Sequence, residues 1–419
     1  MDVLKITTAG SVDDGKSTLI GRLLWDSGSL RQDQIATIER TSRDRGKAFT
    51  DLSLVTDGLR AERDQGITID VAHIYFDTPK RKFIIADSPG HVEYTRNMVT
   101  GASNARVAII LIDARKGVLE QTHRHFAIAA LLRIPEVIVV INKMDLVGYE
   151  QSAFTAIRGD FRQLTTRLRG SAPRLHFIPV SATAGDNVVA HSKAMPWYGG
   201  PTLLEFLEEL PVPDEAAQPG RFPVQWVIRP QSAAHPDYRG YAGRIAAGSL
   251  SVGEPVVVLP SGRRSTVTRI QTLTEELETA PAGRSVTVHL ADQVDVSRGD
   301  MLVPSAQVPT ATRNLRADIC WMDHRNLNSG RILLLQHGTR RIKAKVTDLD
   351  YKLNVHTLDQ VSADGEFKLN DIGGVRLRLG AALHPDRYAD SRATGAFILI
   401  DPHLNQTVAA GMITGWEAQ

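Results

Sequence analysis

The segment V-L-K-I-T-T-A-G-S-V-D-D-G-K-S-T-L-I-G-R-L-L, residues Val3–Leu24, decides the fold of this chain. Its first part, Val3–Thr8, predicts a strand, and the part from Thr18 onward predicts a helix. Between them, Gly10–Ser17 matches the phosphate-binding pattern G-x-x-x-x-G-K-[ST] in the strand–loop–helix context that the pattern requires. Backbone N–H groups and the open helix end donate to phosphate oxygens there, and the two glycines allow close approach. The segment therefore predicts a phosphate site in an α/β domain.

Individual side chains of this loop have expected roles. Lys16 can bridge the outer phosphates, and the Ser17 hydroxyl can ligate a magnesium ion. A glycine-rich turn that matches by chance is the alternative interpretation, and three later motifs weigh against it. The residues expected at the phosphates are Gly10, Ser11, Val12, Asp13, Asp14, Gly15, Lys16, Ser17, Thr18 and, from a later motif, Gly90.

A second motif indicates which base is bound. The tetrapeptide N-K-M-D, Asn142–Asp145, follows the apolar run Val137–Ile141 and is typical of guanine-binding GTPases. The Asp145 carboxylate can accept from guanine N1–H and the N2 amine, which adenine does not offer, and such a site can reject the analogue by roughly 10⁴-fold or more. Asn142 would tie this loop to the phosphate loop, and the Lys143 stem would cover the base. The alternative is a surface turn. The expected guanine site comprises Asn142, Lys143, Met144, Asp145, and Ser181 with Ala182, whose backbone would reach guanine O6.

A third motif predicts the hydrolytic residues. The sequence D-S-P-G-H, Asp87–His91, follows the apolar run Phe83–Ala86. Asp87 would hold magnesium through water, the Gly90 N–H would contact the γ-phosphate, and His91 would be the catalytic residue that orients the attacking water. The alternative for His91 is a helix-start histidine without a role. The expected switch residues are Asp87, Ser88, Pro89, Gly90 and His91.

The sequence G-I-T-I, Gly66–Ile69, is similar to the first switch of translational GTPases. There the Thr68 hydroxyl would ligate magnesium only while the γ-phosphate is present, which would order the segment and release it after hydrolysis. Arg60 and Arg63 could act as an arginine finger, but a solvated charged face is the preferred interpretation. The expected magnesium ligands are Ser17, Thr68 and Asp87.

Composition bounds the class of protein. The 419 residues are too many for one ordinary core and predict two or three domains. A net charge of +2 gives no strong field toward nucleic acid or a membrane, so neither partner is expected. The lone Cys320 excludes an internal disulfide, and no signal-peptide pattern or bilayer-spanning apolar stretch occurs, so we expect a cytoplasmic protein.

Strand and helix patterns alternate in the first half of the chain. Near-continuous apolar runs predict strands buried on both faces, and residues 152–168 repeat apolar side chains at helical spacing. These patterns predict a mostly parallel, doubly wound sheet with the ligand at the carboxyl ends of its strands. The predicted strands are 3–8, 68–76, 83–87, 107–113, 137–141 and 176–181.

The pattern changes after the proline-rich linker 211–220. Short β-branched runs separated by Gly and Pro turns predict an antiparallel barrel over 221–308 and a second all-β barrel domain over 313–419, after a P-loop GTPase domain over 1–210. The predicted strands are 222–229, 243–247, 255–259, 265–273 and 284–290, then 317–322, 331–335, 340–349, 373–379 and 395–400.

Several longer runs carry a likeness to one family. The phosphate loop with its D-D pair, the run I-L-I-D-A-R-K-G-V at Ile110–Val118 and the run D-Y-R-G-Y-A-G at Asp237–Gly243 resemble the large subunit of heteromeric sulfate adenylyltransferase, a member of the translational GTPase superfamily. The likeness covers nearly the whole chain. Further runs that carry it are Asp57–Asp70, Tyr94–Ser103, Met195–Glu205, Val258–Arg263, Gly395–Asp401 and Thr407–Ile413. Ser88 and Val92 depart from the usual D-T-P-G-H-E, and we expect altered packing with a retained site.

The resemblance implies a division of labour between two subunits. A small catalytic subunit would transfer the adenylyl group of ATP to sulfate, giving adenosine 5′-phosphosulfate and pyrophosphate. This chain, with GTP and Mg²⁺, would hydrolyse GTP and raise that activity through its switch segments, in a heterodimer or a higher assembly. Some relatives carry a fused adenylyl-sulfate kinase domain, but no second phosphate-loop pattern occurs after Leu210, so kinase activity is not expected here.

Two other functions compete with this interpretation. An elongation-factor-like GTPase that carries aminoacyl-tRNA shares the same domain plan, but the modest charge and the family-specific runs weigh against it. A nucleotide-binding scaffold without turnover is the third possibility, and it predicts no effect of His91→Ala on GTP hydrolysis.

Overall fold

The computed structural model describes most of the chain, namely residues 2–44, 50–55, 71–88, 95–166, 172–211, 218–230, 238–355 and 357–417. These residues form two compact units, of which the first comprises Met1–Val212 with Asn354–Asp359 and the second Pro213–Leu353 with Gln360–Gln419. Each unit is built around cores of its own.

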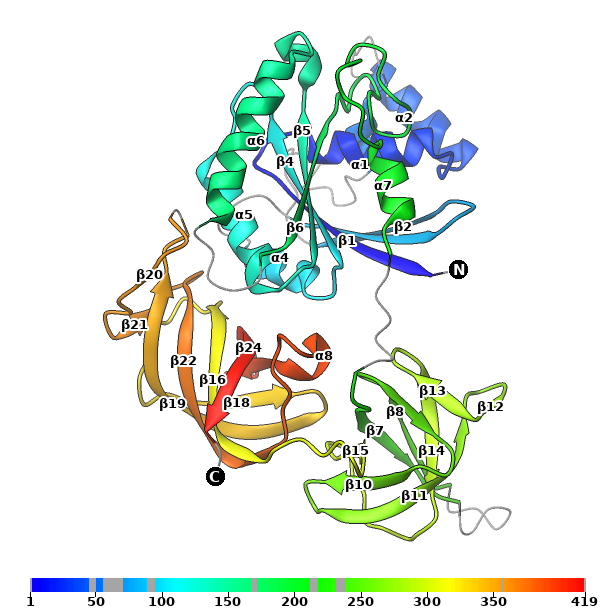
Figure 1. Cartoon of the computed structure of the whole chain (residues 1–419), viewed down its shortest axis with the longest axis vertical. Helices are drawn as coiled ribbons and strands as arrows, with labels where there is room; N and C mark the ends of the chain where they lie inside the picture. Colours follow the sequence, from blue (N-terminus) through cyan, green and yellow to red (C-terminus); the bar gives the residue numbers. More distant parts are fainter. Residues whose placement is uncertain are drawn as a thin grey trace. The chain divides into compact units, whose positions relative to one another are not determined.

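The first unit contains a six-stranded sheet in the order β2-β3-β1-β4-β5-β6 (Figure 1). All its pairings are parallel except that between β2 and β3, which form an antiparallel hairpin at the edge. Parallel strands need covering on both faces, and every residue of β4 and β5 is buried accordingly. The strands are β1 (Val3–Ala9), β2 (Ala72–Asp77), β3 (Lys82–Asp87), β4 (Val107–Asp113), β5 (Glu136–Asn142) and β6 (Arg174–Pro179).

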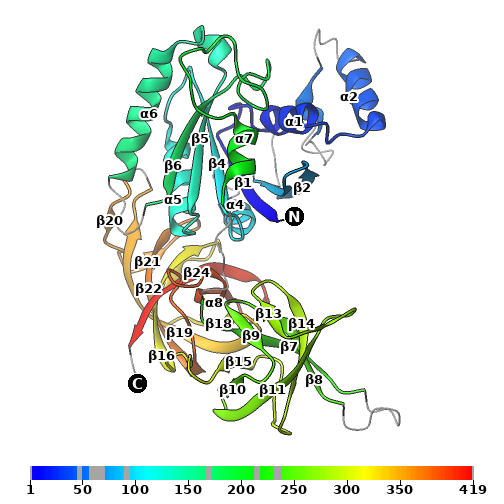
Figure 2. The same cartoon turned by 45° about the vertical axis from the view of Figure 1, so that its right-hand side comes forward.

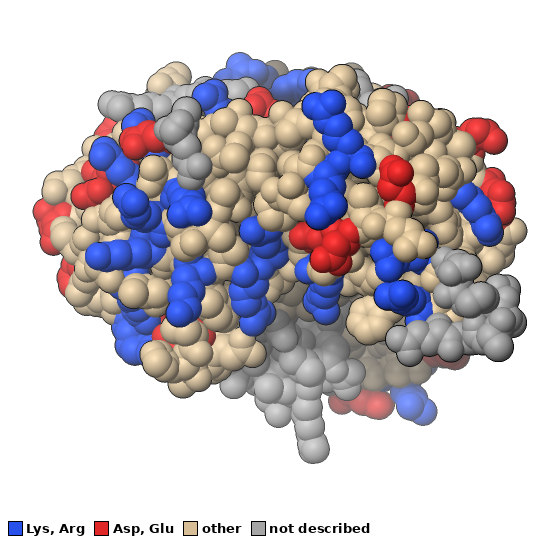
Figure 3. All heavy atoms as spheres, turned by 90° about the horizontal axis from the view of Figure 1, so that it is seen from below, with Lys and Arg blue, Asp and Glu red and all other residues tan. Residues whose placement is uncertain are grey.

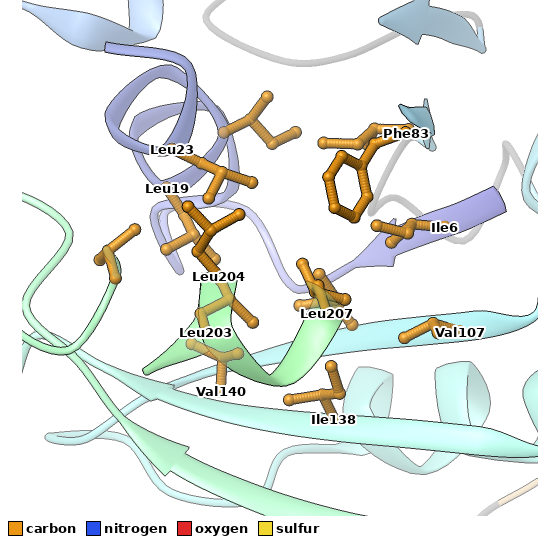
Figure 4. Packing of buried hydrophobic residues seen from close by; sticks show 14 of the residues in the cluster. Ile6, Leu19, Leu23, Phe83, Val107, Ile138, Val140, Leu203, Leu204 and Leu207 are labelled. Carbon is orange, nitrogen blue, oxygen red and sulfur yellow. The ribbon is translucent and has the colours of Figure 1, made fainter. Parts of the chain in front are cut away.

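Helices cover the two faces of this sheet (Figure 2). Leucines of α1 and α7 pack on Ile6, Val107, Ile138 and Val140 of three adjacent strands (Figure 4). On the opposite face, the Phe126 ring of α5 contacts Phe161 of α6, which contacts Phe177 of β6. The helical elements are α1 (Lys16–Asp26), α2 (Gln32–Asp44), η1 (Leu52–Val55), α4 (Thr95–Ala102), α5 (Glu120–Leu131), η3 (Met144–Val147), α6 (Gln151–Thr165) and α7 (Leu203–Glu209).

The second unit contains two antiparallel barrels. In the first barrel, the order β10-β15-β7-β8-β14-β11 is closed by pairing of β10 with β11, and β12 extends β11. A two-stranded ribbon of β9 and β13 accompanies it. The strands are β7 (Phe222–Ile228), β8 (Gly240–Arg244), β9 (Ser249–Ser251), β10 (Pro255–Leu259), β11 (Arg263–Gln271), β12 (Glu276–Leu277), β13 (Thr279–Pro281), β14 (Ser285–Leu290) and β15 (Met301–Pro304).

The second barrel repeats this plan. The order β18-β23-β24-β16-β22-β19 is closed by pairing of β18 with β19, β20 extends β19, and β17 pairs with β21. The elements are β16 (Thr312–Trp321), β17 (Leu327–Asn328), β18 (Ile332–His337), β19 (Arg340–Leu353), β20 (Gln360–Val361), β21 (Glu366–Phe367), β22 (Ile372–Leu383), α8 (Arg392–Gly395), β23 (Ala396–Ile400) and β24 (Thr407–Glu417).

A buried ion pair joins the two barrels. Arg221, at the start of β7, donates from Nε and Nη2 to the two carboxylate oxygens of Asp386 at 3.0 Å each. The guanidinium is almost fully buried, and its Nη1 donates to the Gln307 carbonyl. Because a bidentate pair of this kind fixes both distance and orientation, it holds the barrels in one arrangement.

The predicted fold class, an α/β domain followed by two antiparallel barrels, is confirmed, but several strands differ from their predicted ranges by a few residues, and two of these differences bear on the prediction. The strand predicted at 243–247 lies at Gly240–Arg244, and the strand predicted at 68–76 begins at Ala72, with 68–70 outside the described residues. Pairing sets the observed range of β8, because Gly240–Gly243 pair with β7 and Tyr241–Arg244 pair with β14. Hydrogen bonding to two neighbouring strands, rather than β-branched composition, defines this strand.

Candidate nucleotide-binding site

The candidate site lies at the carboxyl ends of β1, β3, β4, β5 and β6. Each of these strands is followed directly by one of the polar motifs singled out in the sequence. In open α/β sheets this edge is where ligands bind, because the loops converge there and helix N-termini face the ligand. The parallel pairing of the strands therefore brings together motifs that are far apart in the chain.

The phosphate loop is closed on itself by Asp14. The Asp14 N–H donates to the Ser11 carbonyl at 3.2 Å, and the Ser11 N–H donates to Asp14 Oδ2 at 2.7 Å. Gly15 precedes α1 with a φ of 89°, and a Cβ there would lie 2.5 Å from the Asn142 side-chain nitrogen. Both the backbone angle and the space therefore require glycine.

Burial changes the acidity of Asp14. Only 2% of the residue is exposed, and burial raises the pKa of its carboxyl from 3.8 to about 6, although the Ser11 N–H and the nearby Lys116 favour the charged form. Within the described part of the chain, its second oxygen, Oδ1, is buried and accepts no hydrogen bond. The loop that is predicted to bind phosphate thus carries a carboxyl that ionises with difficulty.

Lys16 and Asp87 meet at the ends of adjacent strands. Lys16 Nζ lies 3.4 Å from Asp87 Oδ1, and that oxygen also accepts from the Thr8 hydroxyl at 2.7 Å. Both side chains are buried. The predicted phosphate-binding lysine and the predicted magnesium-side carboxylate are therefore neighbours, as a metal–phosphate site requires.

Asn142 ties three loops together. Its Nδ2 donates to the Asp14 carbonyl at 2.8 Å, and its Oδ1 accepts from the Ala182 N–H at 3.0 Å. The Asp145 carboxylate accepts from the Ser181 hydroxyl at 2.7 Å. A backbone N–H of Ser181–Ala182 is predicted to reach guanine O6; the Ala182 N–H is bonded to Asn142 in this arrangement, and the contact with the base stays a prediction.

A carboxylate that the sequence argument did not single out positions Lys143. Asp113, whose side chain is fully buried, lies 2.9 Å from Lys143 Nζ and 2.7 Å from Arg115 Nη2. Although burial opposes ionisation, the hydrogen bonds from Arg115 and Lys143 outweigh it and hold the pKa of Asp113 well below its usual range. Lys143 also donates to the Asp13 carbonyl, and its own φ is 63°. The signal in the sequence was the D-A-R-K-G run after β4.

Part of the predicted site lies outside the described residues, namely Thr68, Pro89, Gly90, His91, Arg60 and Arg63. Ser88 is described and buried, with its Oγ 3.3 Å from the Thr7 hydroxyl. Among the described residues, no group of three or more His, Cys, Asp or Glu side chains could hold a metal ion by itself. The described part also contains no helix that is long and apolar enough to cross a membrane.

Comparison with known proteins first defines the class. Residues 1–212 match the elongation factor Tu GTP binding domain family, and residues 314–414 match the GTP-eEF1A C-terminal domain-like family. The chain therefore has a GTP-binding domain of the elongation factor Tu type. A crystal structure of sup35 complexed with GMPPNP aligns with a TM-score of 0.45 and 24% identity over 99% of this chain and 94% of that chain.

Curated relatives define the family within that class. Sulfate adenylyltransferase subunit 1 of Aeromonas hydrophila is 49% identical over 414 residues, which are 98% of this chain and 86% of the relative. The bifunctional enzyme CysN/CysC of Mycobacterium tuberculosis is 51% identical over 98% of this chain and 67% of the relative. The chain belongs to the sulfate adenylyltransferase subunit 1 family, and the resemblance seen in the sequence is confirmed.

Proposed function

We propose that this chain binds GTP with Mg²⁺, hydrolyses it, and thereby raises adenylyl transfer to sulfate by a small catalytic subunit. The observation that carries the proposal is the Asn142 side chain, which bonds to both the phosphate loop and the Ser181–Ala182 loop. This bond couples a base-reading loop to a phosphate-binding loop. The family supports a heteromeric enzyme, because its members are named as subunit 1. The single, buried cysteine agrees with a cytoplasmic location.

In the proposed site the nucleotide is held at both ends. Asp145 accepts from the guanine edge, and the stem of Lys143, fixed by Asp113, covers the base plane. Lys16 and the N–H groups of Gly10–Ser17 hold the phosphates. The match to the elongation factor Tu GTP binding domain family already indicates a guanine nucleotide. What we propose is the role of each residue that holds it.

The donor set fits magnesium. Ser17 lies in the first turn of α1 and Asp87 ends β3, and a hydroxyl with a carboxylate is the hard oxygen donor set that Mg²⁺ prefers. Thr68, which lies outside the described residues, would complete the set in the triphosphate state. The ion, when bound, would neutralise charge on the phosphates. His91 would orient the attacking water.

Nucleotide competition tests the base assignment. Asp145→Ala should lower affinity for GDP by roughly 10²- to 10⁴-fold and leave ADP affinity unchanged, because two hydrogen bonds to a charged group are lost. Asp33→Ala, which removes an exposed carboxylate of α2, is the matched control and should bind as the parent does. Equal binding of GDP and ADP by the parent chain would overturn the assignment.

The coupling is tested with the small subunit present. Sulfate-dependent release of pyrophosphate should rise when GTP is added, and His91→Ala should abolish the rise while GDP still binds. The aminoacyl-tRNA alternative predicts instead a GTP-dependent, salt-sensitive retention of aminoacyl-tRNA on filters. Absence of any effect of GTP on pyrophosphate release would refute the coupling.

A further inference from the structure

The outer face of the second barrel carries cations directly opposite one another. In the register of β19 with β22, Lys345 pairs with Arg378, and in that of β22 with β16, Arg376 pairs with Arg316. All four side chains are exposed, while the alternate residues of these strands are buried in the barrel core. Lys343, two residues before Lys345, is exposed on the same side of β19. We call these five residues the cationic face, namely Arg316, Lys343, Lys345, Arg376 and Arg378.

Part of this charge is not balanced within the chain. Like charges directly opposite one another on neighbouring strands destabilise a sheet. Asp350 lies 3.0 Å from Arg376, and Glu417 lies 3.0 Å from Arg316. These two carboxylates offset the repulsion between Arg376 and Arg316. Lys343, Lys345 and Arg378 have no ion-pair partner among the described residues. The whole chain has a net charge of only +2, so three unbalanced cations in one place are a local concentration.

One exposed and one half-buried aliphatic side chain adjoin these cations. Ile332 of β18 is the neighbour of Lys345, and Leu334 is the neighbour of Lys343. Ile332 is 57% exposed. Figure 3 shows several Lys and Arg side chains gathered on the face of the chain seen from below, without identifying individual residues. Apolar residues flanked by arginine and other polar groups are the composition of protein–protein interfaces.

The same strands bear carboxylates that disfavour a nucleic acid. Asp348 and Asp350 are exposed on β19, and Glu417 is exposed at the end of β24. These carboxylates would repel a phosphate backbone that lay along the strands. An acidic protein surface with an apolar centre carries its carboxylates at separate positions. It can therefore place them beside the cations and away from Asp348, Asp350 and Glu417.

We propose that the cationic face, together with Ile332 and Leu334, binds an acidic and partly apolar surface of the other subunit of the heteromeric enzyme. The identity of the partner rests on the proposed function. Charges of this kind act chiefly on the association rate and on the salt dependence of binding. Association of the two subunits should therefore weaken as ionic strength rises.

Charge reversal tests the proposal against a matched control. Lys345→Glu with Arg378→Glu changes the cationic face, and Arg263→Glu with Arg264→Glu makes the same charge change at two adjacent exposed positions of β11 in the first barrel. Affinity for the small subunit, measured by calorimetry or light scattering, should fall roughly tenfold or more in the first double variant. The second double variant should stay within about twofold of the parent. GDP affinity and the circular dichroism spectrum should be unchanged in both.

The outcomes separate this inference from the proposed function. If the parent chain binds the small subunit and both double variants bind it equally well, the inference is overturned and the proposed function stands. If the parent chain does not bind the small subunit, the proposed function fails and the inference fails with it. If the cationic-face variant binds the subunit normally but loses retention of RNA on a filter, the face binds a polyanion and the inference is wrong.

Discussion

Replacing Asp14 by asparagine should stabilise the nucleotide-binding domain, and the gain should grow with pH. Burial raises the pKa of Asp14 from 3.8 to about 6. A carboxyl whose pKa is higher in the folded than in the unfolded chain takes up a proton on folding. The stability that this carboxyl contributes by binding a proton is therefore complete below about pH 4, and it is lost as the pH rises through about 6.

The magnitude follows from these two pKa values. Above about pH 6 the buried charge costs about 3 kcal/mol, and at about pH 5, where most of the folded chain is protonated at Asp14, it costs about 1.5 kcal/mol. Asn keeps an oxygen that can accept from the Ser11 N–H, which is 2.7 Å from Asp14 Oδ2. The variant therefore removes the desolvated charge and preserves the loop.

Thermal unfolding of the full chain measures this effect. The transition whose midpoint rises with GDP belongs to the nucleotide-binding domain. Asp14→Asn should raise that midpoint, by about 3–6 °C more at about pH 8 than at about pH 5. Asp13→Asn removes the same charge from the exposed neighbouring residue and should leave the midpoint nearly unchanged. Equal shifts in the two variants, or a gain that shrinks as pH rises, would refute the reasoning.

Two further predictions concern packing. Gly21→Ala would place a Cβ 2.1 Å from the Leu52 carbonyl oxygen, so we expect a loss of about 1–3 kcal/mol or more in the domain that GDP stabilises. Gly159→Ala, in a helix with nothing within 4 Å, should instead be neutral or stabilise by up to about 1 kcal/mol, and calorimetry of both variants checks the contrast. Arg221→Met leaves the mostly buried Asp386 without its cation, with the Thr394 hydroxyl still donating to it, and should cost about 3–5 kcal/mol in the unfolding transition that GDP does not move. Recovery on adding Asp386→Leu would support this account, and a neutral single variant would contradict it.

The parts predicted well from the sequence are those with local causes. The phosphate loop is recognisable because its glycines, lysine and serine are adjacent in the chain, and Gly15 indeed adopts a positive φ. The buried parallel strands are recognisable because β4 and β5 are unbroken apolar runs. In both cases a short segment carries the whole signal.

The parts that were missed depend on contacts between distant segments. Asp113 positions Lys143 only because β4 and β5 are adjacent and parallel, and no spacing within either motif reveals this. Strand β24 was not predicted because its glycines and alanines have low strand propensity. It forms because Gly411 lies against the Phe397 ring, where a Cβ would be 2.2 Å from Cζ. Tertiary packing, rather than composition, decides such segments.

The single side chain of Asn142, shared between two loops, has a consequence for incomplete ligands. Because one amide holds the Asp14 carbonyl and the Ala182 N–H at once, each end of the pocket is shaped partly by the other. Guanosine alone, or a bare diphosphate alone, would contact only one of these two tied loops. An intact nucleotide that reaches both loops should therefore bind far more tightly than either fragment, because its second contact is made within one pre-aligned site.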